Sequence, residues 1–169
     1  MRVKAAALLL AVAALSAADL PFPADYREWV YLSSGLGMSY AAEQSSGDPS
    51  FDNVFAARSA YASFLRNGTW PNGTVLVLEV RSSRSHGSIN QAGHYQDAVQ
   101  DVEAEVKDQS GAWTFYSFGN KTYPGKAYPR MANCYSCHAQ NAAVDNTFVQ
   151  FYPTLLAVAK QKGTLRPAH

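Results

Sequence analysis

The chain has few cysteines, little net charge and no long apolar run beyond its N-terminal segment. Its two cysteines cannot form a zinc site that needs four cysteine ligands. Its formal net charge of +1 gives no indication of nucleic acid or an anionic surface as a partner. After the first residues, no stretch is long and apolar enough to cross a bilayer. These absences indicate a globular chain whose chemistry depends on a few residues.

The N-terminal segment has the pattern of a secretory signal peptide. Arg2 and Lys4 precede an apolar run, and small residues follow it up to Ala18. We predict a signal peptide over residues 1–18 and export to the periplasm; an uncleaved N-terminal anchor is the alternative. The remaining residues, 19–169, have the length of a single domain, and we predict no membrane span after cleavage.

Both cysteines lie in one motif, Cys134-Tyr135-Ser136-Cys137-His138, which has the C-x-x-C-H spacing of a c-type haem attachment site. Residues three apart share one side of a helical turn, so both thiols can form thioethers at one haem edge. The imidazole of His138 is then the predicted proximal ligand of the iron. We predict one covalently attached haem c, which leaves no thiol for a disulfide. The alternatives are a thiol redox pair, which is expected in a βαβ pattern that is absent here, and half of a zinc site.

The patterns predict an α+β fold, mainly an antiparallel sheet with a few short helices, and the haem on a short helix near the C-terminus. Residues 33–50, 81–93 and 121–130 are expected to be mostly loop, and Asn133 is the predicted N-cap of the haem-bearing turn. The predicted strands are 29–32, 51–55, 74–80, 94–107 (for which a helix is the competing interpretation), 113–118 and 148–152. The predicted helices are a turn at 23–28, residues 57–67 ended by Gly68, and a last helix from Pro153 to Gly163.

Alternation along two of these strands predicts which side chains face the core. Leu76, Leu78 and Val80 form an apolar face of strand 74–80, which we expect to look inward, while Glu79 lies on the other face. In strand 94–107 the acidic residues share one face that includes Glu103, and this alternation favours solvent for that side chain. A β-bulge or a second buried face is the alternative that would turn it inward.

In order and spacing, several segments resemble the cytochrome P-460 family, which includes the β-sheet cytochromes c′ (cytochrome c′-β). The resemblance covers nearly all of the mature chain. It implies a mostly antiparallel β fold, commonly a homodimer, with one c-type haem, a histidine ligand and an open distal side. The segments are Tyr26-Arg27-Glu28-Trp29-Val30, Gly73-Thr74-Val75, residues 103–108, Trp113 with residues 115–119, the haem motif, and Phe151-Tyr152-Pro153.

The same resemblance identifies two positions that separate the members by function. Members that oxidise hydroxylamine have a lysine bonded to the porphyrin edge and a distal carboxylate, whereas cytochromes c′-β have an apolar distal pocket that binds nitric oxide or carbon monoxide. Alignment places Leu78 at the lysine position, and leucine has no nitrogen that could form this bond. Leu78 then lines the distal pocket or is simply part of the core. Glu103 aligns with the carboxylate; near an apolar haem pocket it would have a raised pKa and could relay protons.

The sequence therefore predicts an exported mono-haem cytochrome that binds a small gas or nitrogen oxide. The alternatives are an oxidoreductase acting on hydroxylamine, nitric oxide or peroxide, and an electron-transfer cytochrome with a redox partner protein. Leu78 argues against hydroxylamine oxidation. Electron transfer usually needs a sixth iron ligand, for which Met38 and Met131 are weak candidates. His86 and His94 lie in a polar stretch and are expected at the surface.

Overall fold

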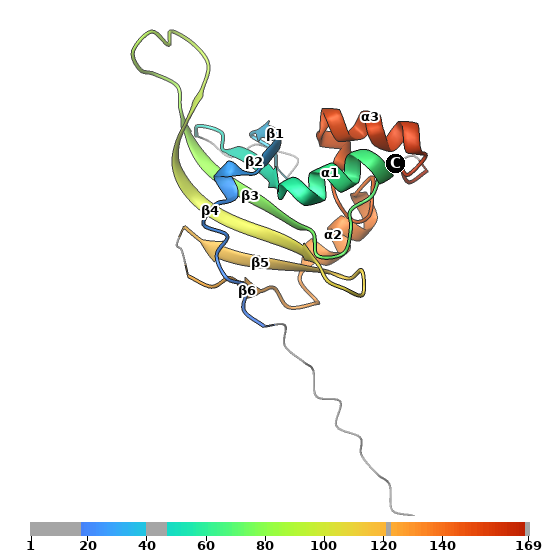
Figure 1. Ribbon diagram of the computed structural model, residues 1–169. Helices are drawn as coiled ribbons and strands as arrows, with labels where there is room; N and C mark the ends of the chain where they lie inside the picture. Colours follow the sequence, from blue (N-terminus) through green and yellow to red (C-terminus); the bar gives the residue numbers. More distant parts are fainter. Residues whose placement is uncertain (1–17, 40–46, 121–122, 168–169) are drawn as a thin grey trace, which may run out of the picture.

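The computed structural model describes residues 18–39, 47–120 and 123–167 and is built on a six-stranded sheet in the order β1-β2-β3-β4-β5-β6 (Figure 1). All neighbouring strands are antiparallel. The predicted α+β class, mainly antiparallel, is therefore confirmed. The strands are β1 (Val30–Leu36), β2 (Phe51–Ala56), β3 (Val75–Arg84), β4 (Tyr95–Lys107), β5 (Trp113–Gly119) and β6 (Lys126–Ala127). The helices are α1 (Arg58–Asn67), α2 (Asn133–Asn141) and α3 (Pro153–Lys162), with 3-10 turns η1 (Tyr26–Glu28) and η2 (Val149–Phe151).

Glycine and proline set the ends of two helices as predicted. Gly68 follows α1 with a φ of 75° and donates its N–H to the carbonyl of Phe64 at 2.7 Å. Pro153 begins α3, and Gly163 ends it with a φ of 66°. A left-handed φ carries no steric penalty for glycine, so both helices stop where the chain must reverse.

The sheet is covered on both faces in its central part. The three helices lie together in Figure 1, and apolar residues of α1 and α3 pack with Leu76 and Trp113 from one face of the sheet. The N-terminal segment, blue in Figure 1, crosses the sheet and packs Tyr26 against Val77 and Phe118 on the other face. The six strands thus separate two apolar clusters.

Leu76 is buried as expected, but the opposite face of β3 does not face solvent. Val77 is fully buried and Glu79 is only 2% exposed, so the opposite face is buried too. The hydroxyl of Tyr26 donates to Glu79, whose carboxylate also accepts from Arg27 Nη2 at 2.5 Å and from Arg81 Nη1 at 3.0 Å. Burial alone would raise the pKa of Glu79, but these hydrogen bonds outweigh it and hold the pKa below its usual range. Through Tyr26 and Arg27, the N-terminal segment is thereby attached to the carboxylate of Glu79, which alternation places on the solvent-facing side of β3.

Three further expectations need correction. Residues 148–152 form no strand, because a tight turn at residues 144–147 leads into η2 and then α3. Helix α2 begins at Asn133 itself; Ala132 precedes it, and no side chain caps it. Strand β1 continues to Leu36, into the stretch expected to be loop.

The remaining expectations concern β4 and the chain start. Residues 95–107 are a strand and not a helix, which confirms the first interpretation of that stretch. The predicted signal peptide lies, except for Ala18, outside the described residues. In the part of the chain that the structure describes, no helix has the length and apolar character needed to cross a membrane.

Candidate haem site

Helix α2 places the three residues of the haem motif on one side. Cys134 and Cys137 are one turn apart, and His138 lies four residues after Cys134, so all three share a helix face. Each of the three is half-buried, and burial raises the pKa of the Cys134 thiol. No residue of α2 is fully buried, so the helix rests on the sheet with its motif face only partly covered.

The imidazole of His138 is fixed in one tautomer. Its Nδ1 lies 2.8 Å from the carbonyl oxygen of Asn146, which can only accept, so Nδ1 carries the proton. The other ring nitrogen, Nε2, therefore keeps its lone pair for a metal. The ring is held between Phe115 and Phe148, with centroids 4.5 and 4.4 Å away. Burial lowers the pKa of His138 and favours the neutral form that binds iron.

A tight turn with two left-handed residues aims the carbonyl of Asn146 at His138. Asp145 and Asn146 have φ values of 49° and 60°, in the left-handed region that non-glycine residues seldom adopt. Lys107 Nζ holds the Asp145 carboxylate at 2.5 Å, and Trp70 Nε1 donates to Thr147 Oγ1 at 2.8 Å. Side chains from two other parts of the chain thus stabilise the turn that orients His138.

Glu105 is the second polar group at His138. Its Oε2 lies 3.4 Å from Nδ1 of His138. Among the described residues, this oxygen is the one buried side-chain polar atom without a hydrogen-bond partner. Burial, with a smaller contribution from the charge of Asp145, raises the pKa of Glu105 to about 8.

The register of the sheet arranges the site in two neighbouring rows that cross β3, β4 and β5. The first row is Leu76, Glu105 and Phe115, of which the last two contact His138. The second row is Leu78, Glu103 and Ser117, two residues or about 7 Å further along the strands. Leu78 and Glu103 are therefore direct cross-strand partners beside the row that contacts His138.

Glu103 is half-buried and hydrogen-bonded, so it is not the solvated side chain that strict alternation favours. The pairing with Leu78 turns the acidic face of β4 toward the helices. Tyr128 donates its hydroxyl to Oε1 of Glu103 at 2.8 Å. Burial raises the pKa of Glu103, and the hydrogen bond from Tyr128 partly opposes this rise. The charge of Glu103 also raises the pKa of Cys134, which indicates that this carboxylate lies near the motif.

Sequence reasoning missed Glu105 and Tyr128. Alternation does put Glu105 on the same strand face as Glu103, and that was the available signal. The contact with His138, however, depends on the β4–β5 register and on the position of α2, and a local sequence pattern predicts neither. Nothing in the sequence around Tyr128 distinguishes it from the other tyrosines of the chain.

The weaker ligand candidates lie at the surface. His86 and His94 are exposed in the long hairpin between β3 and β4, at the top of Figure 1. Nδ1 of His94 lies 3.3 Å from Ser83 Oγ and 3.7 Å from Asp48 Oδ1; both neighbours approach the same nitrogen, so they do not form a serine–histidine–aspartate relay. Met131 is 96% exposed and Met38 is 52% exposed.

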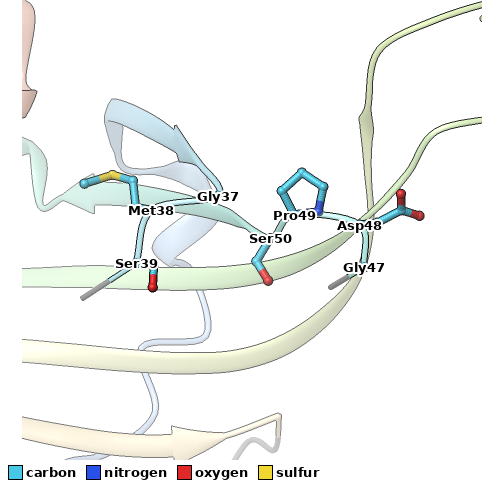
Figure 2. A pocket seen from close by; sticks show the side chains of 7 residues that line it. All are labelled: Gly37, Met38, Ser39, Gly47, Asp48, Pro49 and Ser50. Atoms are coloured by element: carbon cyan, nitrogen blue, oxygen red, sulfur yellow. The ribbon is translucent and has the colours of Figure 1, made fainter. Parts of the chain in front are cut away.

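Figure 2 shows a hollow between the end of β1 and the start of β2, away from the motif. It adjoins Phe51, which pairs with Arg81, whereas the row that contacts His138 is at Leu76. Five residues along β3 correspond to about 17 Å, so this hollow is not part of the haem site. Its lining residues are Gly37, Met38, Ser39, Gly47, Asp48, Pro49 and Ser50.

The side chains on α2 fit a haem group. Two thiols three residues apart and a neutral imidazole with a free Nε2 are the donor set that covalent attachment and axial ligation require. Comparison with protein-family models matches residues 23–149 to the family described as Cytochrome P460. No curated protein matches the chain. Because the match covers most of the chain, the protein belongs to the cytochrome P-460 family, and membership implies a haem cofactor.

Proposed function

We propose that the protein is an exported mono-haem c-type cytochrome that binds a small gas such as nitric oxide or carbon monoxide. Cys134 and Cys137 would hold the haem by thioethers, and His138 would bind its iron. The observation that carries the proposal is the position of Leu78, next to the row that contacts His138 and directly opposite Glu103.

The iron of a bound haem supplies a coordination position that a diatomic gas can occupy. The protein's own residues would set which ligand is favoured. Leu78 has methyl groups and no hydrogen-bond donor, so it offers nothing that holds water and favours a neutral diatomic ligand. The Asn146 carbonyl keeps the proton on Nδ1 of His138 and thereby keeps Nε2 available to the iron.

The test is the absorption spectrum of the protein matured with haem c and reduced, before and after addition of nitric oxide or carbon monoxide. A high-spin spectrum at ordinary wavelengths that shifts with either gas is expected. The matched control is Cys134→Ser with Cys137→Ser, which should lose covalent haem after denaturation. If the reduced wild-type protein gives no spectral change with either gas, the gas-binding function is wrong.

An oxidoreductase acting on hydroxylamine, nitric oxide or peroxide is the second candidate. It is favoured by Glu103, a half-buried carboxyl group with a raised pKa that is hydrogen-bonded to Tyr128 and suited to proton relay. Leu78 argues against the hydroxylamine version, since it cannot bond to the porphyrin. Turnover that is unchanged in Glu103→Gln would remove this residue from the mechanism. A strongly red-shifted Soret band would instead indicate a porphyrin bond from another residue.

Electron transfer with a redox partner protein is the third candidate. The exposure of Met131 gives it no support, because a sixth ligand should be held toward the iron. Sharp low-spin bands in both oxidation states would support electron transfer.

We also propose a periplasmic homodimer, which cell fractionation and sedimentation analysis would test.

A further inference from the structure

Two acceptors lie within reach of the same nitrogen of His138. Nδ1 is 2.8 Å from the carbonyl oxygen of Asn146 and 3.4 Å from Oε2 of Glu105. The first is a neutral backbone group, and the second belongs to a carboxyl group. Because Oε2 is buried and has no hydrogen-bond partner in the described part of the chain, it is available to Nδ1–H.

Oε2 of Glu105 can accept from His138 because the neighbouring cation, Lys107, is already paired with other groups. Lys107 lies on the same face of β4, two residues away, but its ammonium group is taken up by Asp145 at 2.5 Å and by the carbonyl of Trp70 at 2.8 Å. Phe115 pairs with Glu105 across the β4–β5 ladder, and its ring packs on His138. Glu105 is therefore held by a central strand, beside the imidazole.

We infer that Glu105 is a positioning residue that strengthens the bond between His138 and the haem iron by accepting a hydrogen bond from Nδ1. The inference rests on the proposed role of His138 and extends it. An acceptor at Nδ1 makes Nε2 more basic, and a stronger iron–histidine bond favours the ferric state. A carboxyl group has an oxygen that can accept in either protonation state, so the hydrogen bond does not depend on its titration.

The experiment compares the holoprotein with Glu105→Leu, which removes the acceptor at a similar side-chain volume, and with Asp101→Leu, the control four residues away on the same face of β4. The readouts are the iron–histidine stretching frequency of the reduced haem, measured by resonance Raman, and the reduction potential. Glu105→Leu should lower the stretching frequency and raise the potential, because a leucine side chain has no oxygen that can accept from Nδ1. Asp101→Leu should leave the stretching frequency unchanged, since Asp101 pairs with Val80 and its Oδ1 accepts from the backbone N–H of Val102.

The outcomes separate this inference from the proposed function. If the wild-type protein carries no covalent haem, the proposed function fails and the role of Glu105 fails with it. If haem is attached and the stretching frequency is the same in wild type and Glu105→Leu, only the role of Glu105 is overturned. Should Glu105→Leu fail to mature, Glu105→Asp is measured instead. A lowered frequency in that variant supports the role, and an unchanged frequency overturns it.

Discussion

Leu76 and Leu78 lie on the same face of β3 but in different surroundings. Leu76 is 1% exposed and belongs to the cluster under the helices, whereas Leu78 is half-buried and pairs with Glu103. Identical side chains two residues apart therefore offer a matched pair for separating packing from ligand selection.

We expect Leu76→Ala to lower the free energy of unfolding by about 3 kcal/mol, and Leu78→Ala by about 1–2 kcal/mol, because less apolar surface is removed from a half-buried site. Leu78→Ala should in addition speed association of carbon monoxide, since it removes bulk next to the row that contacts His138. Chemical denaturation and flash photolysis measure the two effects. Faster association in Leu76→Ala than in Leu78→Ala would contradict the assignment of Leu78 to the ligand side.

Tyr128 contributes to the ionisation of Glu103 through one hydrogen bond. The hydroxyl donor favours the charged carboxylate and opposes the rise in pKa that burial causes. Tyr128→Phe should therefore raise the pKa of Glu103 further, and the loss of a hydrogen bond to a charged group should cost about 1–3 kcal/mol of stability near neutral pH.

Titration of the Glu103 carboxyl carbon by NMR measures this change. Tyr61→Phe is the control, because it removes a phenol that packs with the helices and leaves the donor to Glu103 in place. An unchanged pKa of Glu103 in Tyr128→Phe would show that the hydrogen bond does not govern its ionisation.

Local sequence patterns predict some residues of the candidate site and not others. The C-x-x-C-H spacing is sufficient to predict Cys134, Cys137 and His138 as the haem residues, because attachment by this motif is confined to one helical turn. Glu105 and the acceptor on Asn146 come from elements that are remote from one another until the sheet and the turn have formed. Such contacts depend on tertiary register, which alternation does not encode.

Helix α2 has few stabilising features of its own. It has nine residues and no fully buried side chain, and its sequence, NCYSCHAQN, contains few strong helix formers. Isolated helices of this length are marginal in water, so tertiary contacts must stabilise it. Covalent attachment at two of its residues would add such contacts.

We therefore expect the amides of α2 to exchange with solvent much faster in the variant Cys134→Ser with Cys137→Ser, prepared without haem, than in the haem-loaded protein. Amides of β3 and β4 in the sheet should remain protected in both forms. Hydrogen exchange followed by mass spectrometry resolves these segments. Helix α3 is the internal control, since it packs through the buried residues Leu155 and Ala159. Equal protection of α2 in both forms would mean that haem does not stabilise it.

The elements themselves follow largely from local signals. Gly68, Pro153 and Gly163 act through fixed backbone preferences, and the ends of α1 and α3 agree with the prediction. The segment 148–152 has β-forming residues but is drawn into η2 by the turn before it and the helix after it. Aromatic and β-branched residues favour half-buried positions, and the short connection to α3 provides such positions without forming a strand.

For the whole molecule, burial of both sheet faces makes the N-terminal segment part of the fold. Alternation places Glu79 on the outer face of β3, yet residues fifty positions earlier cover it and supply Tyr26 and Arg27 as partners. A pattern within one strand cannot report a partner so distant in the sequence. A buried charge is therefore tolerated at Glu79, because four residues donate hydrogen bonds to it: Tyr26, Arg27, Asn53 and Arg81.

This arrangement predicts how stability depends on pH. The pKa of Glu79 is lower in the folded chain than its usual value, so its contribution is present above about pH 4.5 and is lost as the pH falls below that value. Glu79→Gln removes the charge and leaves Arg27 and Arg81 without their shared carboxylate. We expect Glu79→Gln to lower the free energy of unfolding by about 3 kcal/mol at pH 7, and by less toward pH 3, as measured by urea denaturation at both pH values.

Asp97→Asn is the control, because its ion pair with Arg84 is exposed and should contribute little. If the loss in Glu79→Gln is the same at pH 7 and pH 3, the carboxylate does not hold the N-terminal segment by its charge.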